Sequence, residues 1–160
     1  MIEVEIEIQE EGWTRALPNS IALTRQAVLA AGRLVENGGV AILLADDETV
    51  RDLNHRFLGK NAATNVLAFP AAPDLGEHLG DVALAFGVCS SEAEAQGKPL
   101  GDHLRHLVIH GVLHLLGYDH RTDAQARRME TMERDLLASL DVPDPYAGVG
   151  DQGDHVQHGR

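Results

Sequence analysis

Hydrophobic residues recur with two different periods along this chain, and these periods predict both strands and helices. Residues 2–8 alternate isoleucine or valine with glutamate, which is typical of a strand that has one charged face. Short apolar runs predict three further strands, at residues 40–45, 66–69 and 79–86. Capping residues and apolar positions three to four apart predict helices at about 20–36, 47–57, 91–97, 100–116 and 122–140. The order of these elements favours an α+β fold, in which a small mixed sheet of about four strands packs with helices.

Length and composition favour one domain followed by a tail. The chain has 160 residues, of which 44% are hydrophobic, and we predict a single domain over residues 1–142. Residues 143–160 are rich in proline, glycine and aspartate, and we expect a disordered acidic tail there. Cys89 is the only cysteine, so an internal disulfide or a sulfur-rich metal site is excluded. The amino terminus does not have the pattern of a signal peptide, and no apolar run is long enough to span a membrane, so we expect a cytoplasmic location.

The chain is strongly acidic, with a formal net charge of −12 at pH 7. Such a charge disfavours binding to nucleic acid through bulk electrostatic attraction. An RNA substrate would therefore have to meet a local basic patch or be delivered by a partner.

Three histidines in one short segment form the most informative motif of the sequence. His110 and His114 are four residues apart, so on a helix both imidazoles lie on the same face. Gly117 tolerates the left-handed backbone that ends many helices, and the chain can then turn back and bring His120 to the same place. Three neutral imidazoles, with a fourth coordination position left to water, are typical of a catalytic zinc site. We therefore predict one zinc ion per chain, held by His110, His114 and His120 on a helix and the turn after it.

The histidine spacing matches the metzincin pattern H-E-x-x-H-x-x-G-x-x-H at every position except the second. Gly111 occupies the place of the glutamate that acts as general base in those peptidases, and glycine cannot abstract a proton. A metallopeptidase is therefore a weaker alternative. His106 could share a helix face with the motif, but about 12 Å of helix separates His106 from His114. We expect His106 to be a neighbour of the site rather than a ligand.

A carboxylate outside the motif has two interpretations. Asp81 stands near the start of the apolar run at 79–86, where it is either a turn residue or a group that reaches the cleft. In the cleft it would act as a base or would orient a ligand imidazole. Asp119, beside His120, is open to the same two interpretations. Without a glutamate at position 111, the base would be Asp81, the metal-bound water in its hydroxide form, or a group of the substrate.

Two further segments accompany the histidine motif at 110–120: Thr-Asn-Val-Leu-Ala-Phe-Pro at 64–70 and Leu-Gly-Asp-Val at 79–82. Together the three segments closely resemble the bacterial YbeY family of metal-dependent endoribonucleases. The resemblance runs from the early strands to about residue 140, and it implies an α+β fold with zinc on the three motif histidines. It also implies cleavage of single-stranded RNA, with Asp81 as a cleft carboxylate.

The same resemblance implies a role in maturation of the 3′ end of small-subunit ribosomal RNA and in ribosome quality control. The implied partners are ribosomal RNA, proteins of the small ribosomal subunit and a ribosome-associated GTPase, with no part for DNA or a membrane. A ribosome-assembly factor with a mainly structural metal is the alternative function, and a metallopeptidase is the second alternative.

One position departs from the pattern of that family. The family usually has an arginine that lines the cleft where this chain has Leu58. Arg56 lies two residues earlier, about 200° around a helix, and would replace the arginine only if the chain were extended there. Arg56 is therefore our candidate for substrate binding, on the condition of an extended segment at 56–58.

Overall fold

The structure is a computed structural model that describes residues 1–72 and 76–147. Four strands form one sheet: β1 (Ile2–Ile8), β2 (Gly38–Ala45), β3 (Val66–Pro70) and β4 (His78–Ala85). The helices are α1 (Gly12–Ala16), α2 (Ser20–Ala31), the 3₁₀ helix η1 (Gly32–Leu34), α3 (Asp47–Leu58), α4 (Phe86–Gln96), α5 (Leu100–Leu115) and α6 (Asp123–Ala138). Among the described helices, none is both long and apolar enough to cross a membrane. The predicted α+β fold with a small mixed sheet is confirmed.

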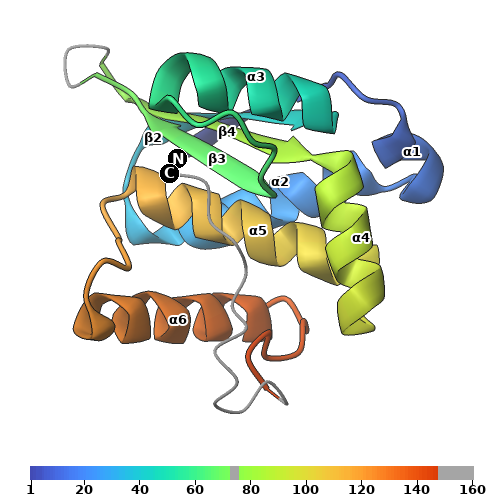
Figure 1. The fold of residues 1–160 in the computed structure, drawn as a ribbon. Coiled ribbons are helices and arrows are strands. Elements are labelled where there is room, and N and C mark those ends of the chain that lie inside the picture. Colours follow the sequence, from blue (N-terminus) through green and yellow to red (C-terminus); the bar gives the residue numbers. More distant parts are fainter. Residues whose placement is uncertain (73–75, 148–160) are drawn as a thin grey trace.

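The strands lie in the order β1-β2-β4-β3. Strands β1, β2 and β4 are parallel, and β3 is antiparallel to β4. Parallel neighbours need a crossover connection, which α2 provides between β1 and β2, and α3 lies in the connection from β2 to β4. Figure 1 shows α3 on one side of the sheet and α2, α5 and α6 on the other side. Helix α5 therefore lies between the sheet and α6.

Side-chain alternation gives the sheet two different faces. Ile42 and Val82 are paired neighbours that point toward α5 and belong to the main core. We call this side the α5 face. The residues before them in the two strands, Ala41 and Asp81, point to the other side, which we call the α3 face. A smaller apolar cluster lies there, between the sheet and α3.

Three local features differ from the sequence-based expectations. The pattern did not predict α1, whose Trp13 is fully buried and donates a hydrogen bond from Nε1 to the Ala45 carbonyl oxygen at 3.1 Å. Helix α4 begins at Phe86, directly after β4 and without an intervening loop, whereas the sequence predicted a start at about residue 91. Helix α2 ends at Ala31 and continues only as the short 3₁₀ helix η1.

The segment just after the predicted domain boundary at 142 contacts the helices. Tyr146 donates a hydrogen bond from its hydroxyl to Glu133 of α6. Asp144 forms an ion pair with Arg134 of the same helix at 3.1 Å. These contacts place Asp144 and Tyr146 against α6, and the domain boundary at 142 stays a prediction. Residues 148–160 lie outside the described residues, and a disordered tail stays a prediction for them.

Candidate metal centre

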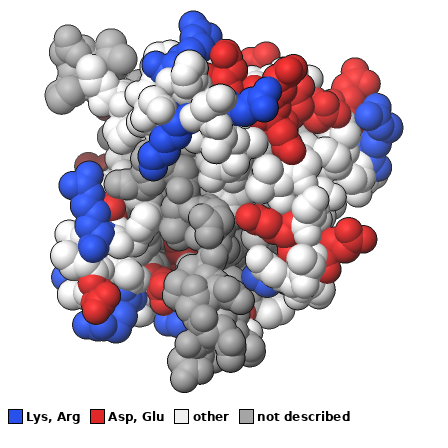
Figure 2. Space-filling model, in the orientation of Figure 1, with Lys and Arg blue, Asp and Glu red and all other residues white. Residues whose placement is uncertain are grey.

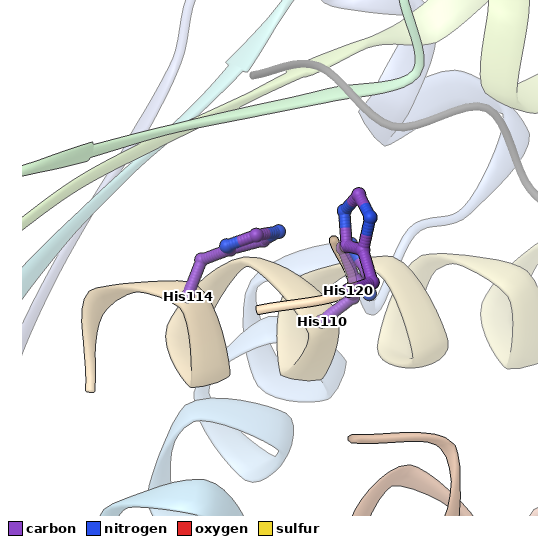
Figure 3. Close-up of side chains that lie close together, drawn as sticks. All are labelled: His110, His114 and His120. Carbon is purple, nitrogen blue, oxygen red and sulfur yellow. The ribbon is translucent and has the colours of Figure 1, made fainter. Parts of the chain in front are cut away.

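The three motif histidines lie together at the carboxyl end of α5 and in the turn after it (Figure 3). Their candidate ligand atoms all lie within 4.8 Å of one another. The ring centroids are 5.0 Å apart for His110 and His114, 5.1 Å for His114 and His120, and 5.7 Å for His110 and His120. His110 is buried, whereas His114 and His120 are half-buried. The cluster thus has one side toward the core and one side toward solvent.

Two capping motifs bring His120 back to α5. The helix ends in a Schellman motif, in which the amides of Gly117 and Tyr118 donate to carbonyl oxygens of the last turn, each at 3.0 Å. Gly117 has a φ of 101°, in the left-handed region that favours glycine. Helix α6 then begins with a capping box whose N-cap is Thr122. The short chain between the two caps carries His120 to the other two histidines.

The donor set fits a zinc ion. Tetrahedral zinc with bonds of about 2.0–2.1 Å needs its ligand nitrogens roughly 3.3–3.4 Å apart. Nitrogens that already lie within 4.8 Å of one another reach this separation through small side-chain rotations. Three imidazoles also leave the fourth position open to water or substrate, which is what a catalytic site requires.

Gly111 faces the sheet rather than the metal cluster. A Cβ atom at this position would lie 2.8 Å from Cγ1 and 3.2 Å from Cγ2 of Val82. Both distances are shorter than favourable carbon–carbon contact, so glycine allows α5 to approach β4 closely. A glutamate side chain here would start inside the core. The position that holds the general base in metzincins is therefore a packing position in this chain.

A buried carboxylate that the sequence analysis missed contacts the site from α6. Glu133 is 0% exposed, and its Oε2 lies 2.5 Å from Nδ1 of His110. Its Oε1 lies 2.9 Å from Nε2 of His106 and also accepts the hydrogen bond of the Tyr146 hydroxyl. This geometry makes His106 a neighbour of the site. The signal in the sequence was an acidic residue inside the apolar stripe of α6, four residues after Met129.

The protonation states in this buried cluster are mutually consistent. Burial alone would raise the pKa of Glu133, but the hydrogen bonds from His106 and His110 outweigh it and hold that pKa well below its usual range. Burial lowers the pKa of His106, despite its bond to Glu133, so the imidazole is neutral at neutral pH. Burial and the Glu133 carboxylate raise the pKa of Tyr146, so its hydroxyl stays protonated and donates. One buried anion thus accepts from three donors.

Asp81 lies on the other side of the sheet from the histidines. It pairs in register with Ala41, and it lines a groove of about 800 Å³ beside α3 together with Glu5 and Glu7. Its exposed carboxylate lies 3.3 Å from Nε2 of His78. Strand alternation turns the Asp81 side chain to the α3 face, so the structure does not bring it to the three histidines.

Arg56 is also on the α3 side. It lies within α3, is largely exposed, and pairs with Asp52 at 3.4 Å. Helix α3 and helix α5 cover opposite faces of the sheet (Figure 1). The segment at 56–58 is helical rather than extended, so the condition for Arg56 to replace the family's arginine is not met. The structure does not bring Arg56 to the histidines.

Charged side chains are unevenly distributed over the surface visible in Figure 2. Lys and Arg are scattered on this face, whereas Asp and Glu gather over the first turns of α3. Asp47 and Glu48 belong to that first turn.

Comparison with known proteins decides the family. Residues 3–141 match the family model described as Endoribonuclease YbeY. The chain belongs to the endoribonuclease YbeY family. The Endoribonuclease YbeY of Paramagnetospirillum magneticum is 47% identical over 157 residues, which cover 91% of this chain and 96% of that protein. The Endoribonuclease YbeY of Maricaulis maris is 47% identical over 149 residues, with 91% and 92% covered.

A solved structure has a similar overall fold. The solution structure of TM1509 from Thermotoga maritima has a TM-score of 0.56 at 21% identity and covers 97% of this chain and all of that one. The family assignment confirms the resemblance seen in the three motifs, and it confirms the predicted enzyme class, an endoribonuclease. All three motifs lie within the matched residues.

Proposed function

We propose that this YbeY-family chain is a zinc-dependent endoribonuclease that cleaves single-stranded RNA. The observation that carries the proposal is the convergence of His110, His114 and His120 within 4.8 Å at the end of α5. Imidazole nitrogens in a three-ligand set with an open fourth position suit zinc in a hydrolytic role. One ion per chain would be held by these three side chains.

The zinc ion and the protein residues would have different roles in this site. A bound zinc ion supplies a water of lowered pKa and a positive charge for a phosphoryl oxygen. The protein holds the ligands in place: Gly117 permits the turn to His120, and Glu133 contacts His110 from behind. His114 and His120 are half-buried, so an RNA strand can approach the cluster from their side. Asp81 and Arg56 have no part in this proposal, because they lie on the α3 face.

The packing of Gly111 disfavours a metallopeptidase. A general base must lie within hydrogen-bond reach of the water that it activates. The side chain at position 111 would instead meet Val82 in the core. The three-histidine cradle is therefore shared with metzincins, but the peptidase base is not.

For the cellular role we propose maturation of the 3′ end of small-subunit ribosomal RNA and ribosome quality control in the cytoplasm. The support is the family assignment together with the acidic surface. A net charge of −12 disfavours capture of free RNA, so delivery by ribosomal proteins and a ribosome-associated GTPase fits the electrostatics.

The first test is an RNA-cleavage assay with metal analysis on the same sample. Single-stranded RNA, its duplex and casein serve as three substrates. We expect cleavage of single-stranded RNA that is lost on chelation, restored by zinc and absent from His114→Ala. Cleavage of casein by the zinc-loaded protein would instead support a peptidase.

The second test places the same variant in cells depleted of the protein. Wild type should restore 3′-end processing of small-subunit rRNA, and His114→Ala should not. Normal processing by His114→Ala, together with its sedimentation on ribosomal particles, would contradict the catalytic role. That outcome would support an assembly factor with a structural metal.

A further inference from the structure

Glu133 is the only fully buried acidic residue among the described residues, and its carboxylate points at the back of the histidine cluster. Burying an ionised carboxylate is costly unless strong hydrogen bonds compensate. Here the compensation comes from His106, His110 and Tyr146, which all contact this one side chain. Glu133 is fully buried, so it cannot contact a substrate and takes no direct part in the hydrolytic step. Its role must act through the residues that it contacts.

We propose that Glu133 is a positioning residue, which fixes the tautomer and the ring orientation of His110 so that Nε2 faces His114 and His120. The proposal rests on the metal centre proposed above. It assigns Glu133 no bond to the metal and no contact with RNA.

The contact with Glu133 involves Nδ1, one of the two ring nitrogens of His110. Oε2 of Glu133 lies 2.5 Å from Nδ1, a distance that fits a strong charge-assisted hydrogen bond donated by the imidazole. A neutral imidazole carries its single proton on one nitrogen, so a proton held on Nδ1 leaves the Nε2 lone pair for a metal. A carboxylate behind a ligand imidazole also makes the ring a stronger donor.

Glu133 is itself held in place by hydrogen bonds from two other residues. Oε1 accepts from His106, one turn before His110 on α5, and from Tyr146 in the carboxyl-terminal segment. That segment is held in turn by the ion pair of Asp144 with Arg134 at 3.1 Å. The carboxylate is thus fixed from three parts of the chain and cannot turn away from His110 without breaking these bonds.

The direct test uses wild-type protein and needs no zinc. Nitrogen NMR of histidine-labelled, metal-free protein reports which ring nitrogen of His110 carries the proton. We expect the Nδ1–H tautomer to dominate at a pH where the ring is neutral. A dominant Nε2–H tautomer would overturn the proposal, whatever the metal affinity is.

The second test measures zinc affinity of metal-depleted protein by competition with a chelator. Glu133→Gln keeps the size of the side chain and removes its charge, and its single amide oxygen can accept either from His110 or from His106 and Tyr146, but not from both sides. We expect zinc to bind about 10–100-fold more weakly, which is typical when the group behind a ligand histidine is removed. The His110 tautomer should become mixed in the same variant.

Two further variants separate positioning from folding. Asp135→Asn, at an exposed position of the same helix, also changes an acidic residue to its amide and is the matched control, with unchanged zinc affinity expected. Tyr146→Phe removes one donor to Glu133 and leaves the ring, and His106 still donates to the same oxygen, so a smaller loss of about 2–5-fold is expected. If Glu133→Gln fails to fold, the zinc affinity of Tyr146→Phe still tests the proposal, and an unchanged affinity would contradict it.

The outcomes distinguish this proposal from the metal centre on which it rests. If wild-type protein binds no zinc but shows the Nδ1–H tautomer, the metal centre fails and the orientation of His110 by Glu133 stands. If wild type binds zinc and folded Glu133→Gln binds it equally well, the metal centre stands and the positioning role is overturned.

Discussion

The two sides of the sheet differ in the burial and hydrogen bonding of their carboxylates. On the α5 face, Glu133 is fully buried and accepts three hydrogen bonds beside a histidine cluster. On the α3 face, Asp81 is exposed in an open groove near Glu5 and Glu7, and it forms an ion pair with His78 at 3.3 Å. A carboxylate that is fixed by its surroundings can orient another group, whereas an exposed one is screened by water and moves freely.

This contrast shows why membership of a family motif does not by itself place an acidic residue in the site. Asp81 belongs to a segment typical of the family and lies 29 residues before His110. Glu133 is 23 residues after His110 and stands in a helix that carries none of the three family motifs. Burial and hydrogen bonding, which only the fold creates, decide which of the two contacts the histidine cluster.

The largest effect should come from removing a ligand on the α5 side. His120→Ala should lower bound zinc from about one ion per chain to a small fraction of that, because two imidazoles hold zinc poorly. His55→Ala, in the exposed part of α3, is the matched control and should keep full zinc content. Metal analysis of purified protein measures both. Zinc affinity of wild type should also fall as the pH drops, since ligand imidazoles must be neutral to bind a metal.

Full zinc occupancy in His120→Ala would remove the turn residue from the ligand set. Loss of zinc in His55→Ala would show that the α3 side also binds metal, and the contrast between the faces would then fail.

A glutamate at position 111 should be the most damaging change to stability. Gly111→Glu adds a Cβ 2.8 Å from Val82 and puts a charge into the core, so we expect a loss of about 3 kcal/mol or more in the free energy of unfolding. Urea denaturation measures the loss, and a peptide panel should show no gain of peptidase activity.

The cause can be isolated by a smaller pair of changes. Gly111→Ala should be rescued in part by Val82→Ala, which removes the two methyl groups that crowd the new Cβ. Purely additive losses in the double variant would mean that Val82 is not what excludes a side chain at this position.

Two glycines that end helices on opposite faces allow an intermediate comparison. Gly117 after α5 and Gly59 after α3 both have positive φ, 101° and 73°, and a Cβ added at either would have no neighbour within 4 Å among the described residues. Alanine at either site should cost about 1–2 kcal/mol of stability through backbone strain. Only Gly117→Ala should also weaken zinc binding, because only that turn carries a ligand. Equal zinc affinity in both variants would show that the turn is not what positions His120.

The smallest effect is expected at Arg56. Its ion pair with Asp52 is exposed on both sides, so Arg56→Ala should change the free energy of unfolding by less than about 0.5 kcal/mol. RNA affinity measured against salt concentration should keep the wild-type slope. A slope reduced by about one unit would place a phosphate contact on the α3 side and would bring the segment at 56–58 back into the substrate path.

Local chemistry made part of this structure predictable. The histidine cluster lies within eleven consecutive residues, 110–120, and helix spacing plus one left-handed glycine determine its shape. The helix expected from about residue 122 and the alternating strand β1 are equally local and were found as predicted. The sheet has four strands, as the short apolar runs indicated.

The remaining features depend on contacts between distant segments. Helix α1 has only five residues and owes its position to the burial of Trp13. The face on which Asp81 lies could not be read from β4, because its apolar residues point to both sides and only the packing of α5 identifies the metal side. In the sequence, Glu133 is one of many acidic residues, and only the packing of α6 on α5 buries it.

The spacing of Glu133 and Tyr146 along the chain has a consequence for the order of assembly. Protein synthesis delivers the amino-terminal part first, so the histidines of residues 110–120 are complete before α6 and the segment with Tyr146 exist. Tyr146 meets His106 across 40 residues of chain. A nascent or truncated chain that ends before α6 therefore has every ligand imidazole but not the carboxylate that orients the first of them. The proposed metal centre therefore gains its full set of contacts only after α6 and the segment with Tyr146 have been synthesised.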